Sequence, residues 1–218
     1  MERRRFLRDG LLATTGVASG FAAGRSTTAT PAAAAGTGDP DDPTEVDLGF
    51  CTDMSAHHVQ ALAICQRVLG RDTGDEVQAA AAEVLQNQAI ELGQMRAWLV
   101  DWGASTSTPA TVMGWMLGHE DDAGDGLSQP VICNVAFSEM IGVASDEDLR
   151  ALSEATGREQ GRQWLTLMRA HHEGGVAMAT AAARLASADK VVRLASWQAE
   201  VQTFEISQYD QLLATTYA

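Results

Sequence analysis

The chain contains an internal repeat, which constrains its fold more than any other feature of the sequence. Residues 54–102 align with residues 168–216 at a constant offset of 114 residues without gaps, and 12 of the 49 aligned positions are identical. In the first copy these positions are Met54, Ala56, His57, His58, Ala63, Asp75, Val77, Ala81, Gln88, Glu91, Gln94 and Leu99. Several are rare residue types and the polar ones fall together, so an internal duplication explains the match better than chance.

Each copy has the pattern of a helical hairpin. In the first copy we expect helices over residues 44–69 and 75–102, joined by a short glycine-containing turn and with Asp75 as the cap of the second helix. In the second copy the helices should cover about residues 158–186 and 189–215. Four helices of roughly 25 residues, with short turns within each pair and one long connection, indicate an all-α fold. The expected architecture is an up-down four-helix bundle built from two duplicated helical hairpins.

The bundle domain is expected to cover residues 44–216. It divides into hairpin one (44–102), a linker (103–157) and hairpin two (158–216). The linker is rich in Gly, Ser, Thr and Pro and ends in a short helix, while residues 131–141 fit either a strand or a helix.

The first residues have the features of an export signal. Arg3, Arg4 and Arg5 precede a mildly apolar stretch rich in Gly, Ala and Thr, so residues 1–24 resemble a twin-arginine signal peptide. Residues 25–43 are of low complexity and are expected to be disordered. We therefore expect an exported, extracytoplasmic protein that is periplasmic, cell-wall-associated or secreted.

Charge and motifs exclude several function classes. The chain has 29 Asp and Glu against 15 Lys and Arg, a net charge of −14, which disfavours nucleic acid and anionic membranes as partners. No apolar run approaches the roughly 18 residues of a membrane span, so no membrane insertion is expected after signal removal. The sequence has no G-x-G-x-x-G, Walker, G-x-S-x-G or H-E-x-x-H motif, so the common enzyme signatures are missing.

The three cysteines contain no C-x-x-C pair, which excludes haem attachment, thioredoxin chemistry and cysteine-rich zinc modules. Cys51 and Cys65 lie 14 residues apart on one expected helix, which separates them by about 21 Å, too far for a bridge. Any disulfide must therefore use Cys133.

Polar residues occupy the faces that should be buried. Met54 and His57 lie on the apolar stripe of the first helix, with His58 at its edge, and Gln88 and Glu91 lie within the stripe of the second. Antiparallel pairing about the turn places Met54 opposite Glu91 and His57 opposite Gln88.

The second copy repeats this arrangement with Met168, His171, His172, Gln202 and Glu205. An approximate two-fold pairing of the hairpins would combine these residues into one layer of four His, two Met, two Glu and two Gln. Buried polar groups are costly without partners. The layer is therefore either a hydrogen-bonded network or a metal site.

The thioethers limit the choice of metal. Met beside His selects Cu(I), or its mimic Ag(I), over zinc or calcium. Met168, His171 and Met178 share one helix face, whereas Ile64 replaces the second Met in the first copy, so any site should be asymmetric.

The segments Met54-x-x-His57-His58 and Met168-x-x-His171-His172 resemble the signature of the domain of unknown function family 305. The second-helix segments around Gln88-x-x-Glu91 and Gln202-x-x-Glu205 are also similar to it, and the resemblance covers about residues 45–216. It implies a ferritin-like four-helix bundle in an exported bacterial protein, and some members of the family bind copper or silver.

The resemblance implies a set of candidate metal ligands, which are Met54, His57, His58, Met168, His171, His172 and Met178. Gln88, Glu91, Gln202 and Glu205 would orient these ligands. The chain departs from the family at Ile64, and its linker keeps only Met113, Met116 and His119 as a possible secondary soft site.

Three functions fit these features. The first is extracytoplasmic sequestration or delivery of Cu(I) or Ag(I), with no catalysis and with a metal donor or acceptor protein as a further partner. The second is a structural or interaction bundle whose polar layer fixes helix register. The third is a dinuclear iron or manganese oxidoreductase, but this needs about four glutamates and Glu-x-x-His motifs, which the buried stripes lack.

Overall fold

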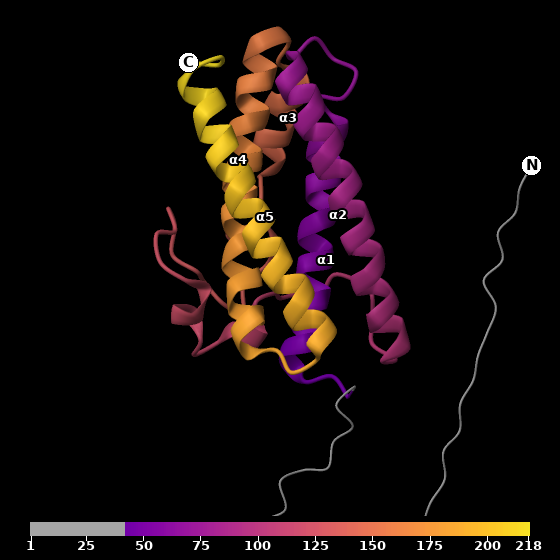
Figure 1. Cartoon of the computed structure of the whole chain (residues 1–218). Coiled ribbons are helices and arrows are strands. Elements are labelled where there is room, and N and C mark those ends of the chain that lie inside the picture. The colour runs from indigo at the N-terminus through magenta and orange to yellow at the C-terminus, as the bar shows by residue number, and fades with distance from the viewer. Residues whose placement is uncertain (1–41) are drawn as a thin grey trace, which may run out of the picture. The chain divides into compact units, whose positions relative to one another are not determined.

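Four long helices make up most of residues 42–218, the part of the chain that the computed structural model describes (Figure 1). They are α1 (Glu45–Gln66), α2 (Asp75–Asp101), α4 (Gly157–Leu185) and α5 (Asp189–Ala214). The short helix α3 (Asp146–Glu154) precedes α4, and the linker carries three 3-10 turns, η1 (Gly114–Met116), η2 (Glu120–Ala123) and η3 (Phe137–Glu139). The described residues contain no β-strand, so the predicted all-α bundle of two helical hairpins is confirmed.

The helix starts follow local capping chemistry. Thr44 and Asp47 form a reciprocal capping box at the start of α1, and Ser145 and Asp148 form another at α3. The start of α2 differs from the prediction, because Gly74 is the N-cap and Asp75 is the first helical residue. Its carboxylate still stabilises the helix, because a negative charge is favourable at the positive end of the helix dipole.

Contacts at both ends of the bundle fix the direction of the helices. Near the start of α1, Asp47 Oδ1 accepts hydrogen bonds from the backbone of Ser187 (3.2 Å) and Ala188 (3.0 Å), which form the α4–α5 turn. Near its end, Gln160 at the start of α4 donates to the Arg67 carbonyl (3.2 Å). α1 and α4 therefore pack antiparallel, and the linker must run the length of the bundle (Figure 1).

The linker is irregular but closely docked. Residues 131–141, which fit a strand or a helix by sequence, form neither beyond the single turn η3 and one isolated bridge between Val112 and Val135. The buried carboxylate of Asp53 accepts hydrogen bonds from the Met113 amide (2.7 Å) and the Trp115 indole (3.0 Å). α1 thereby holds the first part of the linker against the bundle.

The apolar core consists of two clusters separated by a polar layer. The first cluster surrounds Phe50 and Met54 and includes the start of α5, while the second surrounds Ile64 and Trp164 and includes Tyr209 near the end of α5. On every long helix the buried His, Gln or Glu residues of this layer lie between the segments that contribute to the two clusters.

All three cysteines are free thiols. Burial raises the pKa of the Cys51 and Cys65 thiols to about 12, so both stay protonated at neutral pH. None of the helices among residues 42–218 combines the length and apolarity that a membrane crossing requires. The predicted signal at residues 1–24 lies outside the described part of the chain.

We expect Gly174→Ala to destabilise the protein. A Cβ at position 174 of α4 would overlap the backbone carbonyl of Ile141 in the linker, and neither backbone can yield easily. Urea denaturation should show a loss of about 1–3 kcal/mol.

Gly93→Ala on α2 is the matched control. Gly93 is exposed and a Cβ there would meet no atom within 4 Å, so the higher helix propensity of Ala should stabilise by up to about 1 kcal/mol. If both substitutions changed the free energy of unfolding equally, the backbone of the linker would not restrict the space at position 174.

Candidate metal centre

Four histidines from α1 and α4 form the centre of the polar layer. His57, His58, His171 and His172 are all fully buried. Their positions near the middle of two packed helices follow from the repeat, because His57 and His171 are equivalent residues and meet at the interface of the two hairpins.

The outer histidine of each pair binds a glutamate of the neighbouring helix. His58 Nε2 lies 2.8 Å from Glu91 Oε2, and His172 Nε2 lies 2.7 Å from Glu205 Oε2. Because a carboxylate only accepts, each Nε2 carries the proton of the hydrogen bond. The Nδ1 atoms of His58 and His172 are buried and have no hydrogen-bond partner within residues 42–218.

The inner histidines stack on each other. The rings of His57 and His171 have centroids 3.6 Å apart and an interplanar angle of 30°. Burial lowers the pKa of both imidazoles well below 6.5, and neighbouring imidazoles lower it further, so both are neutral at pH 7. His171 Nε2 donates to the His57 carbonyl (3.1 Å), which leaves its Nδ1 as an unprotonated nitrogen.

The layer thus holds several nitrogen atoms without hydrogen bonds. Both ring nitrogens of His57 and the Nδ1 atom of the other three histidines are buried without a partner in the described structure. Each such atom costs about 1–3 kcal/mol of desolvation. One of the two His57 nitrogens carries the proton of the neutral ring and has no lone pair to offer. A ligand that accepts imidazole lone pairs would recover the free energy of the remaining atoms.

The methionines are distributed differently from the prediction. Met54 and Met178 belong to the first apolar cluster, whereas Met168 belongs to the second, with Ile64. All three are fully buried. Met168 and Met178 share a helix face as predicted, but they lie on opposite sides of the histidine layer, so the seven candidate ligands do not form one level.

The first cluster concentrates the thioethers. It contains six of the eight methionines of the chain, which are Met54, Met95, Met113, Met116, Met140 and Met178. Met113 and Met116 of the linker are buried in it, but His119 is exposed and pairs with Asp122. The possible secondary site of these three linker residues is therefore not assembled.

The glutamine positions show one correct expectation and one omission. Gln88 and Gln202 are buried in the layer as predicted, although no hydrogen bond joins them to the histidines within residues 42–218. The sequence interpretation missed Gln198, which donates to Glu91 Oε2 (2.9 Å). Its position one turn before Gln202, on the same buried face, was the available signal, but the equivalent residue in the first copy is Val84.

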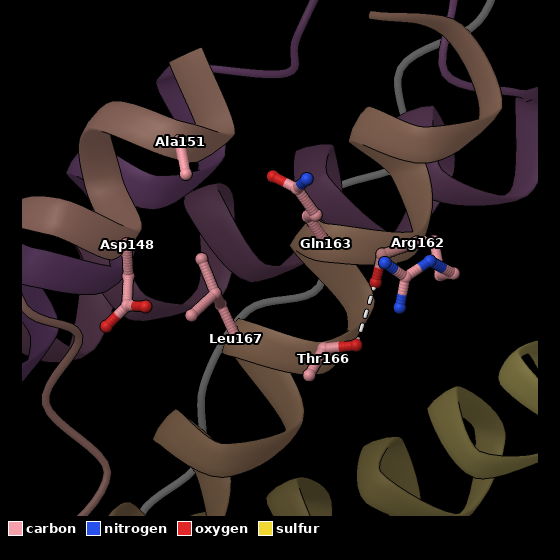
Figure 2. Close-up of a pocket in the computed structure, with 6 residues that line it drawn as sticks. All are labelled: Asp148, Ala151, Arg162, Gln163, Thr166 and Leu167. Atoms are coloured by element: carbon pink, nitrogen blue, oxygen red, sulfur yellow. Dashed lines mark hydrogen bonds between the residues drawn. The ribbon is translucent and has the colours of Figure 1, made fainter. Parts of the chain in front are cut away.

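Other parts of the described chain offer no comparable site. Among residues 42–218, no three His, Cys, Asp or Glu side chains form a group that could hold a metal ion. Figure 2 shows the residues that line a pocket between α3 and α4. The volume of this pocket is about 190 Å³. The pocket contains none of the candidate ligands and is lined by Asp148, Ala151, Arg162, Gln163, Thr166 and Leu167.

The fold and the layer define a duplicated helical bundle with a buried histidine centre. A family model described as "Domain of unknown function (DUF305)" matches residues 47–213, and the chain belongs to this family. The resemblance seen in the repeated motifs is thereby confirmed. The comparison with curated proteins finds no match.

Solved structures of the family share the fold. A DUF305 protein from Streptomyces coelicolor, described as secreted, is 30% identical with a TM-score of 0.66, over 81% of this chain and 94% of that one. A DUF305 fragment from Deinococcus radiodurans is 26% identical with a TM-score of 0.62, over 79% and 97%. CopM in its Cu(I)-bound form is 21% identical with a TM-score of 0.56, over 79% and 98%.

The buried neutral histidines predict a pH dependence of stability without metal. In the unfolded chain His57 and His171 take up protons below about pH 6.5, whereas burial opposes this in the folded state. The free energy of unfolding should therefore fall as the pH drops below about 6.5, and His57→Leu should make this fall less steep. Urea denaturation midpoints of both proteins, measured between pH 5 and pH 8 in the presence of a chelator, give this pH dependence.

His119→Gln is the control, because this histidine is exposed and should leave the profile unchanged. Burial raises the pKa of Asp53 to about 6, so this group makes the free energy of unfolding rise as the pH drops from about 6 to about 4. This contribution should be the same in wild type, His57→Leu and His119→Gln. An unchanged slope in His57→Leu would contradict the prediction.

Proposed function

We propose that the protein binds Cu(I) or Ag(I) outside the cytoplasm and sequesters or delivers it. The observation that carries the proposal is the set of buried imidazole nitrogens without hydrogen bonds, next to a cluster rich in thioethers. Uncharged imidazole and thioether ligands suit a soft monovalent ion, which needs little charge compensation in an apolar core.

Met54 and Met178 are the thioethers we assign to the main site, together with the histidine layer. They come from different repeats, and both belong to the cluster on one side of the layer. On the other side Met168 faces a cluster in which Ile64 stands at the position equivalent to Met178. The duplication therefore provides one half-site with two thioethers and one with a single thioether.

The glutamates orient the ligands in this proposal. Glu91 and Glu205 hold the Nε2–H groups of His58 and His172, so the remaining nitrogen, Nδ1, is the one available to a metal. A carboxylate behind an imidazole also raises its basicity as a ligand. Gln88 and Gln202 complete the polar surroundings of the layer.

Two comparisons support the proposal. CopM, which has the same fold, has been solved in Cu(I)-, Cu(II)- and silver-bound forms. The relative from Streptomyces coelicolor is described as secreted, which agrees with an export role for Arg3, Arg4 and Arg5 at the start of this chain.

Competition between the protein and a chromophoric Cu(I) chelator under anaerobic conditions tests the assignment. Met54→Leu and Met178→Leu should each weaken Cu(I) binding about 10- to 100-fold, because Leu preserves the volume and removes the sulfur. Met168→Leu is the matched control on the opposite side of the layer and should have a smaller effect.

A His57→Ala/His171→Ala double variant should lose copper altogether. Elemental analysis of wild type and variant, purified from an export-competent host grown with copper, provides the second measurement. If folded wild-type protein contains no copper and ignores added Cu(I), the proposal fails, and the layer is a structural hydrogen-bonded network. A larger effect of Met168→Leu than of Met54→Leu would move the main site to the other side of the layer.

A further inference from the structure

A narrow crevice separates α2 and α5 beside the histidine layer. It is lined by Val84, Asn87, Gln88, Glu91, Gln198, Val201, Gln202 and Glu205. Its volume is about 10 Å³, which is close to the lower limit for one water molecule or one small ion. All of its polar lining residues are Asn, Gln or Glu, so their side chains offer oxygen and amide groups but no sulfur or imidazole.

Neighbouring groups compensate the negative charges of the two carboxylates in this crevice only in part. Glu91 and Glu205 are each 8% exposed. Glu91 Oε2 accepts from His58 and Gln198, and Glu205 Oε2 accepts from His172, while the Oε1 atoms have no hydrogen bond within residues 42–218. No Lys or Arg of the described chain forms an ion pair with either glutamate, although buried carboxylates normally require such a partner.

Amide oxygens add further unused acceptors. Gln88, Gln198 and Gln202 are 4%, 1% and 3% exposed, and their Oε1 atoms are buried without a hydrogen bond among the described residues. Gln198 uses its Nε2 group to donate to Glu91, which leaves its carbonyl oxygen as the free end. The residues around this small space therefore carry two carboxylate Oε1 atoms and three amide oxygens without a hydrogen bond among the described residues.

We propose that this crevice binds one hard divalent cation, Ca²⁺, Mg²⁺ or Mn²⁺, through Glu91, Glu205, Gln88 and Gln198. Carboxylate and amide oxygens, completed by water, are the ligands that such ions prefer. The ion would compensate two negative charges that the fold leaves between α2 and α5. A water molecule could fill the same volume, but it would bring at most two donors and no charge.

This site differs chemically from the soft-metal site. Its ligands are oxygens of α2 and α5, whereas the thioethers belong to the apolar cluster on one side of the layer. Glu91 and Glu205 would take part in both, because they line the crevice while their Oε2 atoms bond to the histidines. An ion in the crevice would also link the two hairpins at the level of the layer.

Titration of metal-depleted protein with Mn²⁺ tests the proposal without copper. The decrease of the free Mn²⁺ signal in electron paramagnetic resonance gives affinity and stoichiometry, and calorimetry repeats the titration with Ca²⁺ and Mg²⁺. We expect one site per chain, and Glu205→Gln should weaken it by at least about tenfold. Glu200→Gln is the matched control, because it makes the same charge change at an exposed position of α5.

Gln198→Val tests a ligand without changing charge. Val84 already occupies the equivalent position in the first repeat, so the bundle accommodates this side chain. We expect it to weaken Mn²⁺ binding while circular dichroism shows an intact fold. Met54→Leu should leave Mn²⁺ binding unchanged, so this result separates the cation site from the copper proposal.

Several outcomes would overturn the proposal. One is that folded wild-type protein binds none of the three ions at concentrations up to about 5 mM. The other two are equal affinities of Glu205→Gln and Glu200→Gln, and a Gln198→Val variant that binds as tightly as wild type. If Glu205→Gln unfolds, Gln198→Val alone decides the question.

Discussion

Four buried imidazoles and two glutamates cross the middle of an otherwise apolar bundle, and the rest of the structure is arranged around them. Each outer histidine needs its glutamate, and each glutamate needs its histidine, because neither group reaches water freely. These two contacts join α1 to α2 and α4 to α5 at the level of the layer. The stacked inner pair then fixes the register between the hairpins. The apolar clusters fill the space that remains at either end.

The duplication gives the layer an approximate two-fold symmetry, but the two halves are not chemically equal. The axis passes between His57 and His171, and it carries Met54 onto Met168 on the opposite side of the layer. Substitutions since the duplication have changed the surroundings of each half. Met178 has Ile64 as its counterpart, and Gln198 has Val84. One half is thus richer in sulfur, and the glutamate of hairpin one has gained an extra donor.

The sequence allowed the fold to be predicted closely because its signals are local. Caps at Thr44 and Ser145 and the glycines between the first two helices define helix ends within a few residues. The family and the membership of the polar layer followed from the repeated motifs. The pairing within each hairpin did not, because antiparallel counting about the turn places Met54 opposite Glu91. In the structure the neighbouring histidine at the edge of the stripe, His58, reaches Glu91 instead. The repeat gives no signal for Gln198, because its counterpart in the first copy is the apolar residue Val84.

The linker adds methionines to one end of the bundle only. It is not duplicated, and Asp53 holds it against one end of the bundle, where Met113, Met116 and Met140 join the methionines of the helices. The composition of that end therefore depends on a segment under none of the symmetry constraints of the hairpins. Substitutions in this loop would change the thioether content at one pole of the molecule, while the duplicated scaffold stays the same.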